Sequence, residues 1–288
     1  IIQITIEMML AIPSFAIYFF LIHSYRHRRP RILNDSFFTL YVLNATLSMI
    51  FYLFNLVFLR APGIGIFCDD ILQSMFAQPS YWLSPMYFLL YYLPYTMLFS
   101  NTLMSLNRMC SVIFITNNTQ TWSPSLTRIS IIIIFLLPLP MCWHLLISPA
   151  YYDDVLNGLG LQYIRVIKYT ANSLLNLITH LTCAILCSLF TLATAARMMT
   201  MIKRHKKNEV SLLIVGAVQS IGVLLAAAHQ LYMFIEFSPI LYQKRFVIVD
   251  YQCFCSAWTL LVLSANVRKE ICRSILQQTN AVKSSLVK

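Results

Sequence analysis

ISIIIIFLLPLPMCWHLLISP, residues 129–149, contains no aspartate, glutamate, lysine or arginine. A helix needs about 20 predominantly apolar residues to cross the hydrocarbon core of a bilayer, so this stretch predicts a membrane-spanning helix. The whole chain shares its character, because 59% of the 288 residues are hydrophobic, 11% are charged and the mean hydropathy is +0.70. Soluble domains carry charge on about a quarter of their residues. The composition therefore predicts an integral membrane protein.

Seven apolar runs follow one another along the chain, and the short polar segments between them hold most of the charge, as in helical membrane proteins. The first run lacks the basic N-terminal region of a signal peptide and exceeds its apolar core of about 7 to 15 residues, so we interpret it as a spanning helix. We predict an all-α fold, in which one seven-helix bundle domain accounts for residues 1–288. The predicted helices are 1–22, 36–59, 82–108, 129–149, 169–200, 210–236 and 246–265, followed by a tail at 266–288.

Lysine and arginine are distributed unevenly between the two sides of this bundle. If the N-terminus lies outside, the inner segments hold 16 of these residues and the outer segments hold 5. Basic segments stay in the cytoplasm, so we predict an outside N-terminus and a cytoplasmic C-terminus. The predicted outer set is Arg60, Arg165, Lys168, Lys244 and Arg245.

The basic residues that give the chain its net charge of +11 lie mostly on the predicted inner side. Basic clusters beside a membrane contact anionic lipid head groups, so we expect membrane lipid as a partner and no nucleic acid. Of the eight cysteines, Cys68 lies in an outer segment, and no cysteine between 150 and 168 is present to pair with it. A free thiol and a disulfide with the outer part of the last helix both stay open. Two glycosylation sequons, at 34–36 and 117–119, fall on the predicted inner side and should carry no glycan.

Polar side chains recur on one face of the predicted helix 169–200. Asn172, Asn176 and His180 are four residues apart and therefore align. Polar groups inside a membrane face the interior of the bundle, where His229 and Gln230 approach the same depth. Helix 82–108 enters beside them with aromatic side chains, namely Tyr81, Trp82, Tyr87, Tyr91, Tyr92 and Tyr95. We predict a small-molecule pocket in the outer half, with Tyr87, Tyr91, Tyr95, Asn172, Asn176, His180 and His229 as ligand-binding residues.

An alternative interpretation uses the same residue types. Interhelical hydrogen bonds would employ the amides and imidazoles, and an aromatic belt at the membrane interface would employ the tyrosines and the tryptophan. An enzyme is not indicated, because the histidines lack metal-binding spacing and no GxSxG or Walker-type motif occurs. We therefore expect neither catalysis nor a cofactor.

SLNRMCSV, residues 105–112, places Arg108 where an apolar helix leaves the membrane. Neighbouring polar groups can hold a guanidinium in one packing of the bundle and release it to a cytoplasmic partner in another, which would make Arg108 a switch. The alternative interpretation is that Arg108 anchors the helix end to lipid phosphates.

The same stretch resembles the motif that ends the third helix in nematode serpentine chemoreceptors of the gamma class (Srg), with the Srv class as a close neighbour. Further similar stretches are IPSFAIYFFLI at 12–22, DSFFTLYVL at 35–43, NLVFLRAP at 55–62 and SANVRKEI at 264–271. The resemblance implies a G-protein-coupled receptor in the plasma membrane, in sensory neuron cilia. It implies that a small chemical cue and a heterotrimeric G protein are the partners, and that Asn107 and Arg108 form the signalling switch.

The chain departs from the rhodopsin-like pattern at several positions. It has no acidic residue beside Arg108, no aspartate in the second helix, no CWxP in the sixth and no NPxxY in the seventh. The expectation that the protein couples to a G protein therefore rests on the resemblance to the Srg class. Two other functions stay open: a seven-helix channel or carrier, for which we see no inverted repeat, and a membrane scaffold without a ligand.

Overall fold

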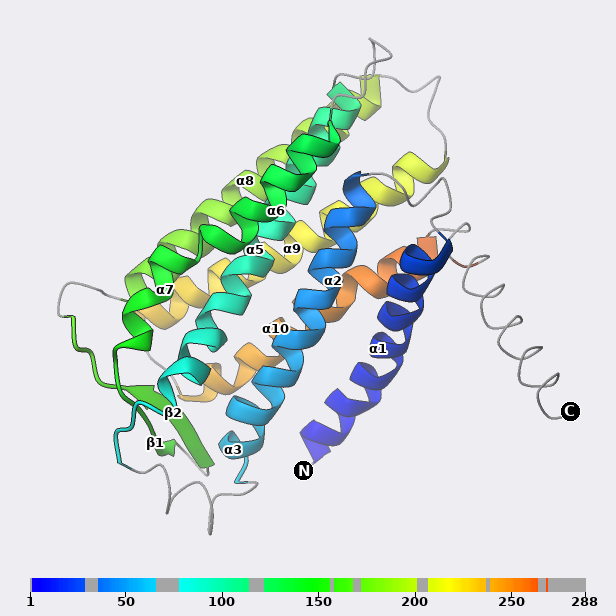
Figure 1. Cartoon of the computed structure of the whole chain (residues 1–288). Coiled ribbons are helices and arrows are strands. Elements are labelled where there is room, and N and C mark those ends of the chain that lie inside the picture. Colours follow the sequence, from blue (N-terminus) through cyan, green and yellow to red (C-terminus); the bar gives the residue numbers. More distant parts are fainter. Residues whose placement is uncertain are drawn as a thin grey trace, which may run out of the picture.

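The computed structural model describes residues 2–28, 36–65, 78–113, 122–155, 158–167, 172–200, 207–236, 239–263 and 268. Within these ranges the chain forms seven helical rods that alternate in direction (Figure 1). The helices are α1 (Ile2–Arg28), α2 (Ser36–Asn55), η1 (Leu56–Arg60), α3 (Ala61–Gly63), α5 (Ser84–Ile113), α6 (Pro124–Leu136), α7 (Leu139–Leu146), α8 (Asn172–Thr200), α9 (Lys207–Ile235) and α10 (Pro239–Leu263). The second rod joins α2, η1 and α3, and the fourth joins α6 and α7.

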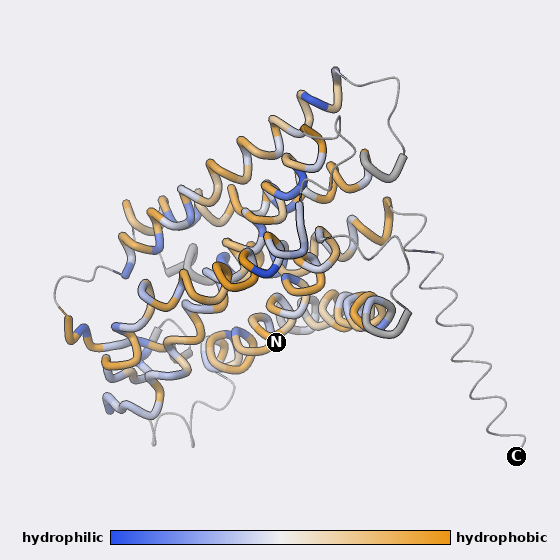
Figure 2. Tube along the Cα trace, turned by 45° about the horizontal axis from the view of Figure 1, so that its top comes forward, coloured by the Kyte–Doolittle hydropathy of each residue, from blue (hydrophilic) through white to orange (hydrophobic). Residues whose placement is uncertain are grey.

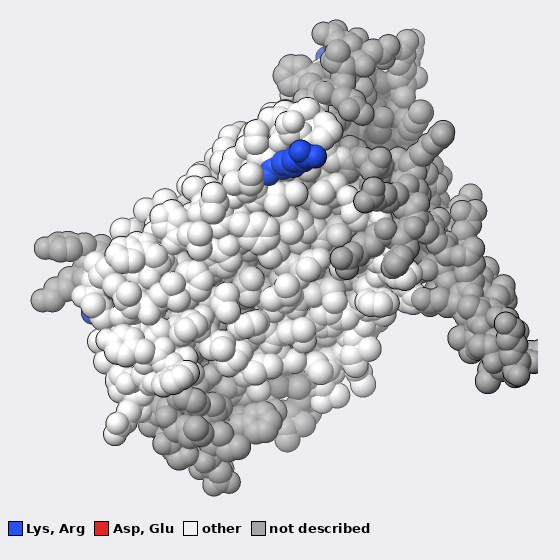
Figure 3. Space-filling model, in the orientation of Figure 1, with Lys and Arg blue, Asp and Glu red and all other residues white. Residues whose placement is uncertain are grey.

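The predicted all-α membrane fold is confirmed. In lipid, each backbone amide and carbonyl must find its partner within the protein, which an α-helix achieves alone. Apolar residues dominate the traces of the rods (Figure 2), and Figure 3 shows a face nearly free of charged side chains. Five described segments are long and apolar enough to cross a membrane: Ser36–Gly63, Pro124–Leu146, Asn172–Thr200, Val210–Ile235 and Lys244–Leu263.

The rod α5 is not among these five segments, and it occupies the centre of the bundle. It packs against α2, α6, α7, α8 and α9, so most of its surface meets protein and little of it meets lipid. Polar side chains such as Ser100 and Asn101 are buried there. A central helix of this kind can carry polar groups that a lipid-facing helix excludes.

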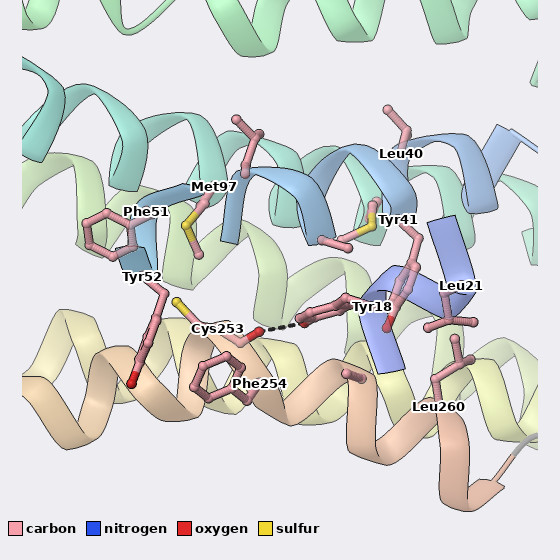
Figure 4. Close-up of a cluster of buried hydrophobic side chains, with 14 of the residues drawn as sticks. Tyr18, Leu21, Leu40, Tyr41, Phe51, Tyr52, Met97, Cys253, Phe254 and Leu260 are labelled. Atoms are coloured by element: carbon pink, nitrogen blue, oxygen red, sulfur yellow. Dashed lines mark hydrogen bonds between the residues drawn. The ribbon is translucent and has the colours of Figure 1, made fainter. Parts of the chain in front are cut away.

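A hydrophobic core joins the first, second and last rods. The hydroxyl of Tyr18 in α1 donates to the carbonyl oxygen of Cys253 in α10 over 2.5 Å (Figure 4). Tyr52 of α2 packs on Phe254 of α10 with ring centres 4.8 Å apart. Aromatic side chains bury large areas and pack in fixed geometries, so these contacts set the positions of α1 and α2 against α10.

Two local breaks interrupt the rods. The turn at 137–138 separates α6 from α7, and Pro138 lies in it because proline removes a backbone donor and bends a helix. In the second rod the chain changes from α-helix to π-helix at η1. Single-turn π-helical segments occur frequently at functional sites.

A β-hairpin, which the sequence analysis did not expect, covers one end of the bundle. Strands β1 (Ala150–Val155) and β2 (Gly158–Tyr163) pair antiparallel, with Val155 opposite Gly158. A bridge between Ser80 and Ala150 ties the hairpin to the segment before α5. Figure 1 shows the hairpin at the same end as α3 and the N-terminus. The cluster of Asp153, Asp154, Asn157 and Gly158 is the sequence signal that could have predicted a turn here, since these residue types are typical of turns.

Candidate ligand-binding cavity

A cavity of about 400 Å³ lies at the hairpin end of the bundle. Side chains of α2, α5, α8, α9 and α10 form its walls, and β2 with the residues after it completes them. Its volume falls within the range of about 300 to 1,000 Å³ that small-molecule sites occupy. Six of the seven predicted ligand-binding residues line it: Tyr87, Tyr91, Asn172, Asn176, His180 and His229.

The polar wall comes from α8 and α9, and its side chains also join the two helices. The side-chain amide of Asn176 donates to Oε1 of Gln230 over 2.8 Å. Nδ1 of His180 lies 2.8 Å from the backbone oxygen of Asn176, one turn earlier in α8. Asn176 and Gln230 therefore line the cavity and also join two helices, so both interpretations of the sequence apply to them, whereas the His180 bond lies within α8.

The aromatic wall comes from α5 and the hairpin. The rings of Tyr87 and Tyr91 have centres 5.2 Å apart, and the ring centre of Tyr163 in β2 lies 5.0 Å from that of Tyr87, with the two rings tilted by 31°. This contact places the hairpin directly on the wall of the cavity. The cavity is thus closed on one side by a strand pair rather than by a helix.

Three tyrosines and a tryptophan that the sequence grouped with this wall lie elsewhere. Tyr95 is fully buried and does not line the cavity; its ring centre lies 6.4 Å from that of His180, behind the polar wall. Tyr81 and Trp82 are exposed, which fits the aromatic belt at a membrane interface. The hydroxyl of Tyr92 donates to the backbone of Phe135 in α6. Tertiary contacts explain this division: Tyr95 lies against α8, Tyr92 faces α6, and Tyr81 and Trp82 precede α5.

A buried ion pair, which sequence reasoning missed, lies beside the cavity. The sequence places Arg60 in an outer segment, and in the structure its side chain is buried, with only 1% exposed. Its guanidinium binds both carboxylate oxygens of Asp250 in α10. It also donates to the backbone oxygen of Phe246 over 3.1 Å. Nε donates to Asn55 Oδ1 over 2.9 Å. The ion pair therefore connects η1 to α10 one residue away from the lining residues Leu59 and Val249.

The predicted switch residues lie toward the opposite end of α5. Arg108 is 24 residues beyond Ser84, which corresponds to about 36 Å of helix. Its guanidinium carbon lies 3.8 Å from the ring centre of Phe37, and the Asn107 amide donates to the Ser36 hydroxyl over 3.0 Å. Arg108 also borders a small cavity of about 10 Å³ together with residues of α8 and α9, including Gln219.

Several sequence predictions fall outside the described residues. They concern the disulfide state of Cys68, the glycosylation of the two sequons and the form of the tail at 266–288. Among the described cysteines, Cys110, Cys142, Cys183, Cys187, Cys253 and Cys255 are free.

A seven-helix membrane bundle with a ligand-sized cavity at one end has the architecture of a serpentine receptor. Comparison with known proteins gives the family: the model of the Srg family chemoreceptors matches residues 4–271, and the chain belongs to this family. It is 28% identical to serpentine receptor class gamma-3 of Caenorhabditis elegans, over 87% of this chain and 77% of that protein. It is 27% identical to class gamma-69 of the same organism, over 91% of this chain and 79% of the relative. The resemblance inferred from short motifs is thereby confirmed.

Proposed function

We propose that this protein is a G-protein-coupled chemoreceptor, which binds a small chemical cue in the cavity and signals to a heterotrimeric G protein. The observation that carries the proposal is the cavity of about 400 Å³, lined by polar groups of α8 and α9 and by tyrosines of α5. Membership of the Srg family supports a receptor function and no catalytic one. In this proposal residues 1–288 act as one receptor domain in contact with membrane lipid.

The ligand would act by shifting an existing equilibrium between two packings of the bundle. It must bind one packing better than the other, since equal affinity shifts nothing. The α8–α9 contact through Asn176 and Gln230 lies in the cavity wall, so a ligand there changes how these helices meet. Further along the same helices, α8 and α9 border the small cavity beside Arg108. A shift of α8 against α9 would therefore reach the switch residues Asn107 and Arg108.

The proposed orientation places the hairpin and the N-terminus outside and the C-terminus in the cytoplasm. The distribution of lysine and arginine, 16 in the inner segments and 5 in the outer segments, supports this orientation. The cavity would then face the exterior, as a receptor for external cues requires. The protein would operate in the plasma membrane of sensory neurons, in their cilia.

The test is a ligand screen with nucleotide exchange on the G protein as readout, followed by Asn176→Ala and His180→Ala. Both changes remove polar groups from the cavity wall, and we expect each to lower ligand potency about tenfold, the effect of one lost buried hydrogen bond. Ile178→Ala is the matched control, because Ile178 lies between them in α8 and is exposed. Surface labelling measures expression of each variant.

Unchanged potency in both variants would remove the proposed site. A ligand-evoked current in cells without functional G proteins would instead support the channel alternative. In the same assay, Arg108→Ala should retain ligand binding and lose nucleotide exchange, which separates recognition from signalling.

A further inference from the structure

One ring nitrogen in the polar wall of the cavity has a fixed hydrogen-bonding role. His180 of α8 lines the cavity and is only 6% exposed, and burial disfavours the charged imidazolium. Its Nδ1 lies 2.8 Å from the backbone oxygen of Asn176, which can only accept a hydrogen bond, so Nδ1 carries the proton. In the neutral ring the other nitrogen is then an acceptor. The helix thus sets the tautomer of His180, and Nε2 presents a lone pair.

Nε2 of His180 is left for a bound molecule. Within the described part of the chain it has no hydrogen-bond partner, because the bond to Asn176 uses Nδ1 and the contact with Tyr95 is between rings. Nε2 of His144 in α7 differs from it: that atom is fully buried, whereas Nε2 of His180 retains accessible surface in a residue that lines the cavity. An acceptor removed from bulk water is unfavourable until it gains a donor. A ligand that donates to Nε2 therefore gains a contact that the protein itself does not provide.

The other polar groups of the wall do not impose the opposite requirement. Side-chain amides such as that of Asn172 both donate and accept, so they adapt to either kind of ligand. Arg165 offers donors only, but it is exposed, and water can satisfy these donors whichever ligand is bound. Arg245 and His229 are half-buried and make contacts of their own. His180 combines burial with a fixed role, so it is the group that discriminates between ligands.

The remainder of the lining suits an apolar ring. Three tyrosines contribute aromatic side chains to it, namely Tyr87, Tyr91 and Tyr163. Aliphatic and aromatic side chains without polar atoms add to them, including Phe51, Leu90, Pro94, Ala226 and Val249. Aromatic rings pack favourably on one another, and an apolar body that leaves water adds affinity in proportion to its buried area. A ligand that uses both features of the wall has an aromatic body and a hydroxyl group that can donate.

We propose that the cavity recognises a neutral aromatic alcohol, whose hydroxyl donates to Nε2 of His180 and whose ring packs against the tyrosines of the wall. This inference rests on the proposed ligand-binding function and adds the chemical class of the ligand. His180 is the residue that determines specificity in it. It favours a hydroxyl over an ether or a hydrocarbon of similar size, because these leave Nε2 without a partner.

The test measures thermal unfolding of the full chain in phosphatidylcholine nanodiscs with three naphthalene probes. 2-Naphthalenemethanol donates a hydrogen bond, its isomer 2-methoxynaphthalene only accepts one, and 2-methylnaphthalene does neither. A ligand that binds the native state raises the unfolding temperature as its concentration increases. We expect the alcohol to act at about tenfold lower concentration than either of the others, the effect of one buried hydrogen bond. Partition into the lipid would favour the ether and the hydrocarbon instead, because both are less polar than the alcohol.

Variants of His180 test whether its Nε2 causes the preference. His180→Phe keeps a ring and removes the acceptor, so the three probes should act at similar concentrations. His180→Gln retains an acceptor near the end of the side chain and should keep part of the preference for the alcohol. His144→Phe is the matched control, because His144 is a buried histidine that does not line the cavity. It should keep the full preference.

Ala226→Phe narrows the cavity and separates this inference from the proposed function. If all three probes stabilise the protein equally and Ala226→Phe abolishes their effects, the cavity binds ligands but the preference for a donor is refuted. If Ala226→Phe leaves the effect of the alcohol unchanged, or His180→Phe keeps the preference, the alcohol does not bind as proposed and the inference fails. No effect of the alcohol refutes the inference as well, and leaves the receptor proposal to its own test by nucleotide exchange.

Discussion

Single residues in this bundle show how a membrane protein retains polar groups. Arg60 is buried in a low-dielectric interior, where an isolated charge would be strongly unfavourable. It persists because Asp250, Asn55 and the backbone of Phe246 surround its guanidinium. The rings of Tyr52 and Phe246, with centres 5.1 Å and 5.0 Å from the guanidinium carbon, add cation–π contacts. One ion pair thus fastens the π-helical segment of the second rod to the last helix.

We expect Arg60→Met and Asp250→Leu each to destabilise the protein by about 3 to 5 kcal/mol, since each leaves an uncompensated buried charge. The double variant should lose less than the sum of the two, because it removes both charges together. Thermal unfolding of the purified protein measures all three, with Arg128→Met as the exposed control. Additive losses would show that the two side chains do not stabilise each other.

Asn176 and His180 illustrate a second residue-scale point. Both are polar residues on one helix face, and both serve packing and cavity at once. A polar residue within a predicted span is therefore a good indicator of the bundle interior. It does not say whether a ligand or a neighbouring helix uses the group.

Among the elements, the β-hairpin has the largest consequence for the cavity. Its strands bring Leu161, Gln162 and Tyr163 onto the wall, and Tyr152 donates from its hydroxyl to the backbone of Phe58. The hairpin ends lie close together, because Ile164 donates its amide to the Pro149 oxygen over 2.9 Å. The chain can therefore be reconnected across this point without moving α7 or α8.

Replacing residues 150–163 with a short glycine linker should open the cavity and leave the helices in place. Ala226→Cys lines the cavity, so its reaction with a water-soluble maleimide should become several-fold faster in the shortened chain. Gly216→Cys, ten residues earlier in α9, is the control; it borders the small cavity near Arg108, and a Cβ there meets nothing within 4 Å. Its rate should not change. Equal rates at 226 with and without the hairpin would show that the strands do not close the cavity.

At the scale of the whole molecule, the two ends of the bundle differ in chemistry, and α5 with its 30 residues runs from one end to the other. The cavity lies at the hairpin end, and Arg108 lies near the other. This arrangement suits a protein that transmits a signal across a membrane only if the hairpin end faces outside. Orientation is therefore the prediction on which the others depend.

An epitope tag before Ile1 should be accessible to antibody on intact cells, and a tag after Lys288 should be accessible only after permeabilisation. The physical reason is the retention of basic segments in the cytoplasm. Endoglycosidase treatment should leave the electrophoretic mobility unchanged at the native sequons 34–36 and 117–119. Staining of the C-terminal tag on intact cells would overturn the orientation and the receptor function together.

The sequence by itself determined the seven rods and the family. Both follow from local properties: an apolar run of sufficient length must form a helix in lipid, and short motifs such as SLNRMCSV are contiguous in the chain. The alignment of Asn172, Asn176 and His180 is equally local, since it depends only on the repeat of one helix.

Only the tertiary structure decided which of these faces meet. Arg60 and Asp250 are 190 residues apart, and a pair so distant in the chain leaves no periodic signal in a single sequence. Tyr91 and Tyr95 share one face of α5, yet only Tyr91 lines the cavity, because Tyr95 is buried against His180 of α8. The repeat of a single helix does not show such a contact between helices. The cavity likewise exists only where α5, α8, α9, α10 and the hairpin converge. Its position depends on contacts between distant segments, and no local pattern encodes such contacts.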